Sequence, residues 1–325
     1  MTDLIITNGD SSADLLRLAG REAAVVSWRD VLHEGPILPG PLAGCSPARV
    51  AYLAARFRVD AAGVAADFAE RDALIRVHRD FATVELWFEH DLYDQLQLLQ
   101  VLAFFAGEEA RDRLILVQAD DFLGTQSAET ILAFANHARP VTTADLELAA
   151  GVWADLAQPT PERIAARLNR PEGPLPFLRP ALLRFLEELP APGSGVGRSE
   201  RTMLAHIAGG TAEPAKLFHQ VIAAEEAAFM GDWSFFRQLE DLAECAVPLV
   251  AGLPPPSNGP FDGERFRDAR LVLTAAGENV LAGLADHVAL NGLDRWWAGT
   301  RLFGHAVWRF DAEAGLLVPP DVSGQ

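Results

Sequence analysis

Residues 83–102 change their hydrophobic period within a few positions, and this change constrains the fold more than any other feature of the chain. Residues 83–88 read TVELWF, which is β-branched and aromatic enough to predict a buried strand. The apolar residues that follow recur at the spacing of a helix: Leu92, Leu96, Leu99 and Leu102. Between the two patterns lie Glu89, His90 and Asp91. Burying such groups is costly unless they are paired or used, so this junction of strand and helix predicts a site.

Other segments of the first half of the chain have the same organisation. Residues 4–7 (LIIT) and 23–27 (AAVVS) predict short strands, and polar residues follow each of them. Residues 113–118 (RLILVQ) predict a fourth strand, which two aspartates follow closely. Strands that alternate with helical patterns indicate βαβ units. We therefore expect an α/β domain over residues 1–140, Rossmann-like and with a mostly parallel sheet.

The polar residues after these strands are the candidates for a functional site. Ligands of open α/β sheets bind outside the carboxyl ends of the strands. We therefore expect one cleft to be lined by Asp10, Asp30, His33, Glu89 and His90. The catalytic candidates are Asp10, Ser11, His33, Glu89, His90 and Asp91. The candidates for binding a cofactor are Gly9, Ser12, Asp30 and Glu34.

Three chemical roles are open for these residues. Asp10, Glu89 and Asp91 can hold a divalent metal or orient a water molecule, with His33 or His90 as the acid or base. Ser11 can instead be a nucleophile beside one of these histidines. A backbone nest at residues 9–12 can bind phosphate at a helix N-terminus. The zinc-protease pattern HExxH is excluded, because the pair His33–Glu34 lacks the second histidine.

Helix capping is the structural alternative for two of these motifs. Ser11 and Asp14 have the spacing of a capping box. Asp91 is likewise suited to cap the helix that begins at Leu92. Capping explains either motif taken alone, but it does not explain three polar junctions, two of which contain histidine.

After residue 140 the strand patterns give way to helical ones. Residues 141–192 predict a helical connector, and the Pro- and Gly-rich stretch 190–197 predicts a linker. Residues 193–325 then show three helices, a strand, a long loop at 254–268 and a returning strand, which is the element order of a winged helix. Residues 306–310 and 316–318 predict a hairpin. We expect the tryptophans near residue 296 to bury this tail and Arg295 to pair with an anion.

Charge argues against nucleic acid as a partner. The chain has a formal net charge of −18, and residues 199–290 hold six Lys or Arg against thirteen Asp or Glu. We expect the third helix to bury Trp233 and Phe236 in its own domain. Its acidic residues should face solvent: Asp232, Glu240 and Glu244. Only a local patch could contact DNA, formed by Arg265, Arg267 and Arg270.

Bulk properties predict a cytoplasmic protein with no membrane segment. No apolar stretch approaches the ~20 residues that span a bilayer, and no signal-peptide pattern is evident. Cys45 and Cys245 lie far apart and do not indicate a disulfide framework.

The three junction motifs resemble a known family. They read ITNGDS (residues 6–11), WRDVLHEGP (28–36) and WFEHDLYDQL (87–96). Together they resemble the bacterial family catalogued as domain of unknown function 1835, over residues 1 to about 140. The resemblance implies a bacterial cytoplasmic protein and brings no activity with it.

Two functions are consistent with these patterns. The first is an enzyme with an acidic, histidine-containing cleft that carries out hydrolysis or group transfer on a small molecule, with a divalent metal as a possible cofactor. The second is a regulator, in which the α/β domain senses a small ligand and the winged helix contacts a partner.

Overall fold

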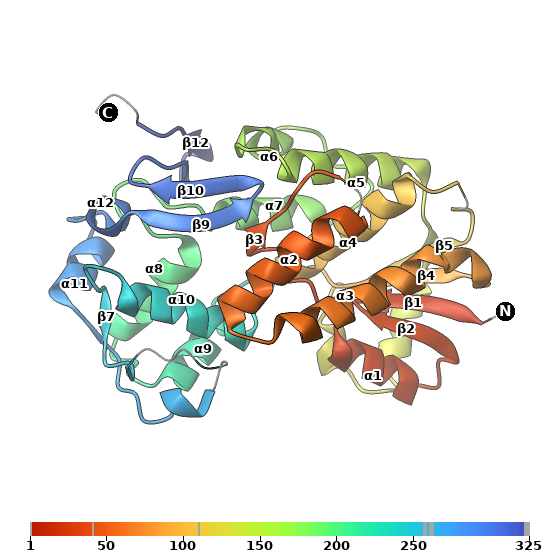
Figure 1. Cartoon of the computed structure of the whole chain (residues 1–325), viewed down its shortest axis with the longest axis horizontal. Coiled ribbons are helices and arrows are strands. Elements are labelled where there is room, and N and C mark those ends of the chain that lie inside the picture. Colours follow the sequence, from red (N-terminus) through yellow and green to blue (C-terminus); the bar gives the residue numbers. More distant parts are fainter. Residues whose placement is uncertain (1, 41, 110, 256–258, 260–262, 322–325) are drawn as a thin grey trace.

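A five-stranded sheet forms the first part of the structure, a computed structural model that describes residues 2–40, 42–109, 111–255, 259 and 263–321 (Figure 1). Its strands are β1 (Asp3–Thr7), β2 (Ala23–Ser27), β4 (Val84–Phe88), β5 (Leu114–Gln118) and β6 (Arg139–Pro140). Their order is β2-β1-β4-β5-β6, and only the edge strand β6 runs antiparallel to its neighbour. The expected α/β region with a mostly parallel sheet is therefore confirmed.

The helices of this region are α1 (Asp10–Leu18), α2 (Leu42–Phe57), α3 (Ala61–Arg76) and α4 (Leu92–Ala106). Helix α4 is apolar on almost every face and is correspondingly buried, since it packs against later helices as well as β4. Asp91 caps α4 by accepting a hydrogen bond from the Asp94 backbone nitrogen (3.1 Å), as its sequence predicted. The expected capping box of Ser11 and Asp14 is wrong: α1 begins at Asp10, and no side chain caps it.

Helices dominate the rest of the chain. They are α5 (Thr143–Leu156), α6 (Glu162–Arg167), α7 (Leu178–Leu186), α8 (Arg198–Ala208), α9 (Pro214–Ala223), α10 (Asp232–Glu244), α11 (Ala275–Leu281) and α12 (His287–Asn291). Two short strands, β7 (Val250–Ala251) and β8 (Val272–Leu273), pair antiparallel after α10. Short 3-10 helices lie at His78–Asp80, Leu123–Thr125, Ile131–His137 and Gly263–Phe266. Part of the loop expected at 254–268 lies outside the described residues.

A second sheet joins the beginning of the chain to its end. It contains β10 (Thr300–Gly304), β9 (Leu293–Ala298) and β3 (Gly35–Pro36), in that order. β3 lies parallel to β9, with Gly35 opposite Trp297. The sequence patterns did not predict this sheet, because β3 is too short to have a period of its own. The predicted hairpin is confirmed as β11 (Arg309–Asp311) and β12 (Leu316–Val318).

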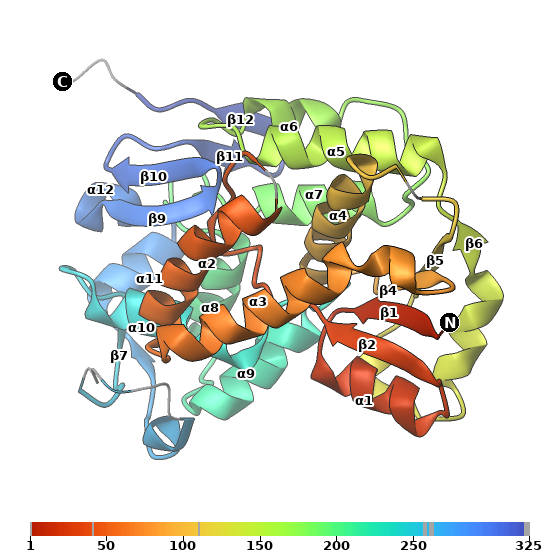
Figure 2. The same cartoon turned by 45° about the vertical axis from the view of Figure 1, so that its right-hand side comes forward.

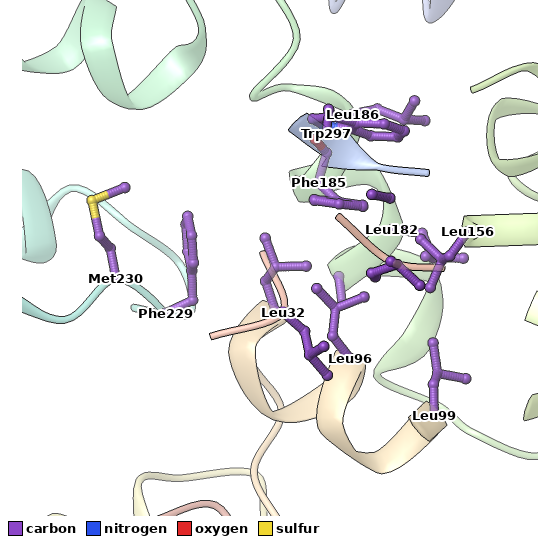
Figure 3. Packing of buried hydrophobic residues seen from close by; sticks show 14 of the residues in the cluster. Leu32, Leu96, Leu99, Leu156, Leu182, Phe185, Leu186, Phe229, Met230 and Trp297 are labelled. Atoms are coloured by element: carbon purple, nitrogen blue, oxygen red, sulfur yellow. Dashed lines mark hydrogen bonds between the residues drawn. The ribbon is translucent and has the colours of Figure 1, made fainter. Parts of the chain in front are cut away.

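Trp297 and Phe310 belong to the hydrophobic core, as the sequence predicted, and Trp308 packs against it. Trp296 is only half-buried, and Phe303 is 64% exposed. Trp297 stacks on Phe185 with 4.2 Å between ring centroids, and its indole N–H donates to the Phe185 carbonyl (3.0 Å). Figure 3 shows this pair near Leu32 and Leu96, which come from the first part of the chain. One continuous core therefore connects the parallel sheet to β9. Truncating an aromatic in such a core costs about 3–5 kcal/mol.

Helix α10 is not oriented as the sequence predicted. Phe236 is buried and stacks on Phe266, as expected. Trp233, however, is 39% exposed and lies against Phe57 of α2. Glu240 was expected in solvent but is buried, because it forms ion pairs with Arg237 and Arg265. One side of α10 therefore packs against α2, beside which it lies in both views (Figures 1 and 2).

Candidate functional site

The strand order brings the three predicted junctions to one edge of the sheet. Loops after β1, β2 and β4 lie side by side there, because these strands are parallel neighbours. Their side chains nevertheless separate into different environments, so the single cleft expected from the sequence is wrong. Asp10 and His33 do line the same apolar hollow of about 820 Å³. The other expected residues do not line it: Asp30, Glu89 and His90.

Three buried carboxylates cluster where β4 meets α4. Oxygens of Glu89, Asp91 and Asp94 lie within 4.8 Å of one another, and we call these residues the acidic triad. The Asn8 amide donates to Asp94 Oδ2 (2.9 Å), and the Leu123 backbone N–H donates to Glu89 Oε1 (2.7 Å). One oxygen from each of the three residues lies close enough to the others to hold a cation.

Burial raises the pKa of each carboxyl group of the acidic triad. Burial and then the charge of Glu89 raise the pKa of Asp91 to about 8. Burial likewise raises the pKa of Glu89 and holds that of Asp94 well above its usual range. Without a cation the triad is therefore a hydrogen-bonded network in which protons reduce the repulsion.

Asp10 does not join the metal set expected from the sequence. It is exposed and accepts three hydrogen bonds from Arg29, at 2.7, 3.0 and 3.1 Å. The hydrogen bond from Arg29 lowers the pKa of Asp10. Asp94 takes its place in the triad, three residues after Asp91 and one helical turn along. The spacing of Asp91 and Asp94 is visible in the sequence, but it is equally typical of a capped helix start.

The Ser11 and Gly9 predictions also lack support in the geometry. Both ring nitrogens of His33 are without a hydrogen-bond partner among the described residues, so His33 does not activate Ser11 here. Gly9 is extended (φ 178°, ψ −176°), which is not the left-handed conformation of an anion-binding nest. Ser12 is buried beside Gly124. His90 lies between Phe122 and Phe177, away from the acidic triad's metal-ligand set.

Asp30 has a structural partner. Its Oδ1 accepts from Arg49 Nε (2.9 Å) and Nη2 (2.7 Å), and both side chains are buried. Arg49 also donates to the backbone carbonyl of Glu34 (2.6 Å). This ion pair ties the loop after β2 to α2, whereas Asp30 Oδ2 is buried with no hydrogen-bond partner among the described residues. A role for Asp30 in binding a cofactor stays a prediction.

A polar cavity of about 450 Å³ lies where α2, α10 and β9 meet. We call it the central cavity. Its polar and aromatic lining includes His33, Glu34, Tyr52, Arg56, Glu188, Glu200, Gln238, Asp241, His287, Asn291, Asp294, Arg295 and Trp296. Both ends of the chain contribute to this wall.

Neither a protein-family model nor a curated protein sequence matches the chain. The geometry of the site is therefore what indicates a function.

Glu34 is the most unusual group of the central cavity. It is only 9% exposed; its Oε2 accepts from Arg56 Nε (2.8 Å), while its Oε1 is buried with no partner among the described residues. Burial acts to raise the pKa of Glu34, but the charge of Arg56 holds it below its usual value. Burial lowers the pKa of the neighbouring His33. An ionised carboxylate therefore lies next to a neutral imidazole.

Two ion pairs hold carboxylates of the cavity wall, one between residues 95 positions apart and one between residues four positions apart. Arg295 Nη1 donates to Glu200 Oε1 (2.8 Å), and Arg184 Nη1 donates to Glu188 Oε1 (2.7 Å). Glu188, Glu200 and Arg56 were not site candidates in the sequence. No local signal marks Glu200 or Arg56, because their partners lie 95 and 22 residues away. Glu188 lies four residues after its partner Arg184, a spacing common to any helical ion pair. The expected anion partner of Arg295 is thus a carboxylate of the protein itself.

Proposed function

We propose that this protein is an enzyme that carries out hydrolysis or group transfer in the central cavity. The observation that carries the proposal is the pair Glu34 and His33. Both line one cavity, and the Glu34 Oε1 and both His33 nitrogens have no partner among the described residues. Buried polar atoms are normally hydrogen-bonded, and exceptions concentrate at functional sites.

The proposed roles follow from the two protonation states. Ionised Glu34 takes a proton from a water molecule or a substrate hydroxyl, and the resulting oxygen attacks an acyl or phosphoryl centre. Neutral His33 donates its N–H to the oxyanion that develops. Glu34, now protonated, returns the proton to the leaving group. Each step uses groups that the cavity already holds, and it needs no metal.

Screening wild-type protein against chromogenic esters, amides, phosphate esters and glycosides tests the proposal. The variants are Glu34→Gln and His33→Asn, and the control is Glu147→Gln, an exposed carboxylate on α5. We expect turnover of one substrate class, reduced about 10²–10⁴-fold by Glu34→Gln. Turnover that survives both cavity substitutions would exclude this assignment.

The metal-assisted form of the reaction stays a prediction. The acidic triad offers three carboxylate oxygens, but none of its members is among the residues that line the central cavity. A cation there would stabilise the start of α4 and would act on the cavity only indirectly. The pH and cation experiments described in the Discussion test this possibility.

We also propose that α8, α9, α10 and the β7–β8 pair form a winged-helix module whose role is structural. The order of these elements supports it. In this module α10 would be the recognition helix, yet it faces α2: Arg56 Nη1 contacts Asp241 at 2.7 Å. This contact favours the enzyme over a DNA-contacting regulator.

Membership of the family catalogued as domain of unknown function 1835 is a further proposal, supported by the three junction motifs. None of the helices in the described part of the chain combines the length and hydrophobicity needed to cross a bilayer. A cytoplasmic location stays a prediction.

A further inference from the structure

The central cavity carries more negative charge than its own cations neutralise. Its wall includes Glu34, Glu188, Glu200 and Asp241, whereas only Arg56 and Arg295 supply positive charge from the lining. Arg184 pairs with Glu188 from behind the wall, but it is shared with Glu225 (2.7 Å). Burial also lowers the pKa of His33 and His287, which favours their neutral forms.

The unpartnered atoms of this wall are mostly acceptors. Glu34 Oε1 and Gln238 Oε1 have no hydrogen-bond partner among the described residues. Of the two unpartnered His33 nitrogens, one accepts and one donates when the ring is neutral. A ligand that satisfies this wall must therefore bring several N–H or O–H donors.

The spacing of the carboxylates does not suit a metal ion. In the described part of the chain, three ligand atoms come within 4.8 Å of one another at the acidic triad and at no set of cavity residues. Charges that are spread around about 450 Å³ match a molecule with separated cationic groups. Trp296 adds an aromatic surface to the same wall, which favours ammonium and guanidinium groups.

We propose that the central cavity binds an organic cation with two or more ammonium or guanidinium N–H donors, positioned by Glu34 and Gln238. This inference rests on the proposed function and names the substrate class of the same site. A carboxylate oxygen accepts two hydrogen bonds, so the cationic group donates to Glu34 Oε1 beside the water or hydroxyl from which Glu34 takes its proton. The second group reaches the carboxylates near Arg295. The excess negative charge disfavours anionic ligands, so within the proposed function it favours an acyl centre over a phosphoryl centre.

Calorimetric titration of the full chain tests the inference with three probes of equal length: 1,5-diaminopentane, 1,5-pentanediol and glutarate. Agmatine and spermidine are two further cationic probes. We expect at least one cationic probe to bind, with an affinity that falls as salt rises, and no binding of the diol or the diacid. Glu34→Gln should weaken binding by about tenfold or more, because it removes a charge-assisted hydrogen bond. Glu147→Gln should leave the affinity unchanged.

A second variant keeps the test independent of how well Glu34→Gln folds. Gln238→Met removes the other unpartnered acceptor without removing a charge, and it should weaken binding less than Glu34→Gln. The inference would be overturned if no cationic probe binds, or if 1,5-pentanediol binds as tightly as 1,5-diaminopentane. If turnover still depends on Glu34 in that case, the proposed function stands and only the substrate class is wrong. If cations bind but turnover ignores Glu34, the cavity is a binding site and the enzyme proposal fails.

Discussion

Arg56 donates from Nε to Glu34 Oε2 at 2.8 Å, and its Nη1 lies 2.7 Å from Asp241 on α10. One guanidinium thus joins the loop after β2 to a helix almost two hundred residues further along the chain. The same contact keeps Glu34 ionised in a buried position. Loss of Arg56 should therefore affect stability and the acid–base properties of the cavity together.

Arg56→Gln should lower the free energy of unfolding by about 3–5 kcal/mol at pH 7, because it leaves a buried carboxylate uncompensated. In the wild type the pKa of Glu34 is lowered, so its contribution to stability is present above the ordinary Glu pKa and is lost as the pH falls. In the variant we expect burial to raise that pKa, so stability is lost as the pH rises. In urea melts, the loss of unfolding free energy in Arg56→Gln relative to the wild type should shrink as the pH falls from 7 to 4. Arg56→Lys should lose less unfolding free energy than Arg56→Gln. A deficit that does not change with pH would contradict this account of Glu34.

The acidic triad should make the free energy of unfolding fall as the pH rises, which is opposite to the contribution of Glu34 in the wild type. Folding raises the pKa of Asp91 to about 8, so its protonated form favours the native state. That contribution is complete below the unfolded pKa and is lost as the pH rises towards 8, by about 1.4 kcal/mol per pH unit for each proton involved. Asp91→Asn retains the capping oxygen and should flatten this slope. Urea melts from pH 5 to pH 9 measure it, and identical slopes for both proteins would show that Asp91 is ionised throughout.

A divalent cation would compete with these protons. If the triad binds Mn²⁺ or Mg²⁺, thermal stability should increase with the cation at pH 8.5, by about 2.7 kcal/mol at a hundredfold excess over Kd, and much less at pH 6. Glu89→Gln and Asp91→Asn should remove the gain, whereas Asp10→Asn should not, because Asp10 pairs with Arg29. If neither the cation nor EDTA changes the thermal stability at either pH, the triad is a protonated network that binds no cation.

The region around α10 should not bind duplex DNA measurably at physiological salt. It carries a net negative charge, Arg265 pairs with Glu240, and Arg267 pairs with Glu264. Titration of a random duplex at low and moderate salt checks this expectation. Micromolar binding with a steep salt slope, lost when Arg265, Arg267 and Arg270 are substituted, would instead support the regulator.

Local patterns predicted the parts of the fold that depend on neighbours in sequence. The period change at residues 83–102 located β4 and α4, and alternating patterns located β1, β2 and β5. The pairing of β3 with β9 was not predictable in this way, because a two-residue strand has no period. The same applies to the site: Glu34 was a candidate, but its Arg56 contact and the Glu200–Arg295 wall arise only from tertiary packing.

The central claim is that Glu34 moves a proton in the central cavity, and chemical rescue tests it most directly. Glu34→Ala should lose turnover of the substrate identified by screening, by about 10²–10⁴-fold in kcat, and should leave space for a small carboxylate. Added formate should restore turnover in a saturable manner, while Glu147→Ala should neither lose turnover nor respond to formate. Full turnover of Glu34→Ala without formate, or a loss that formate cannot restore in a folded variant, would contradict the claim.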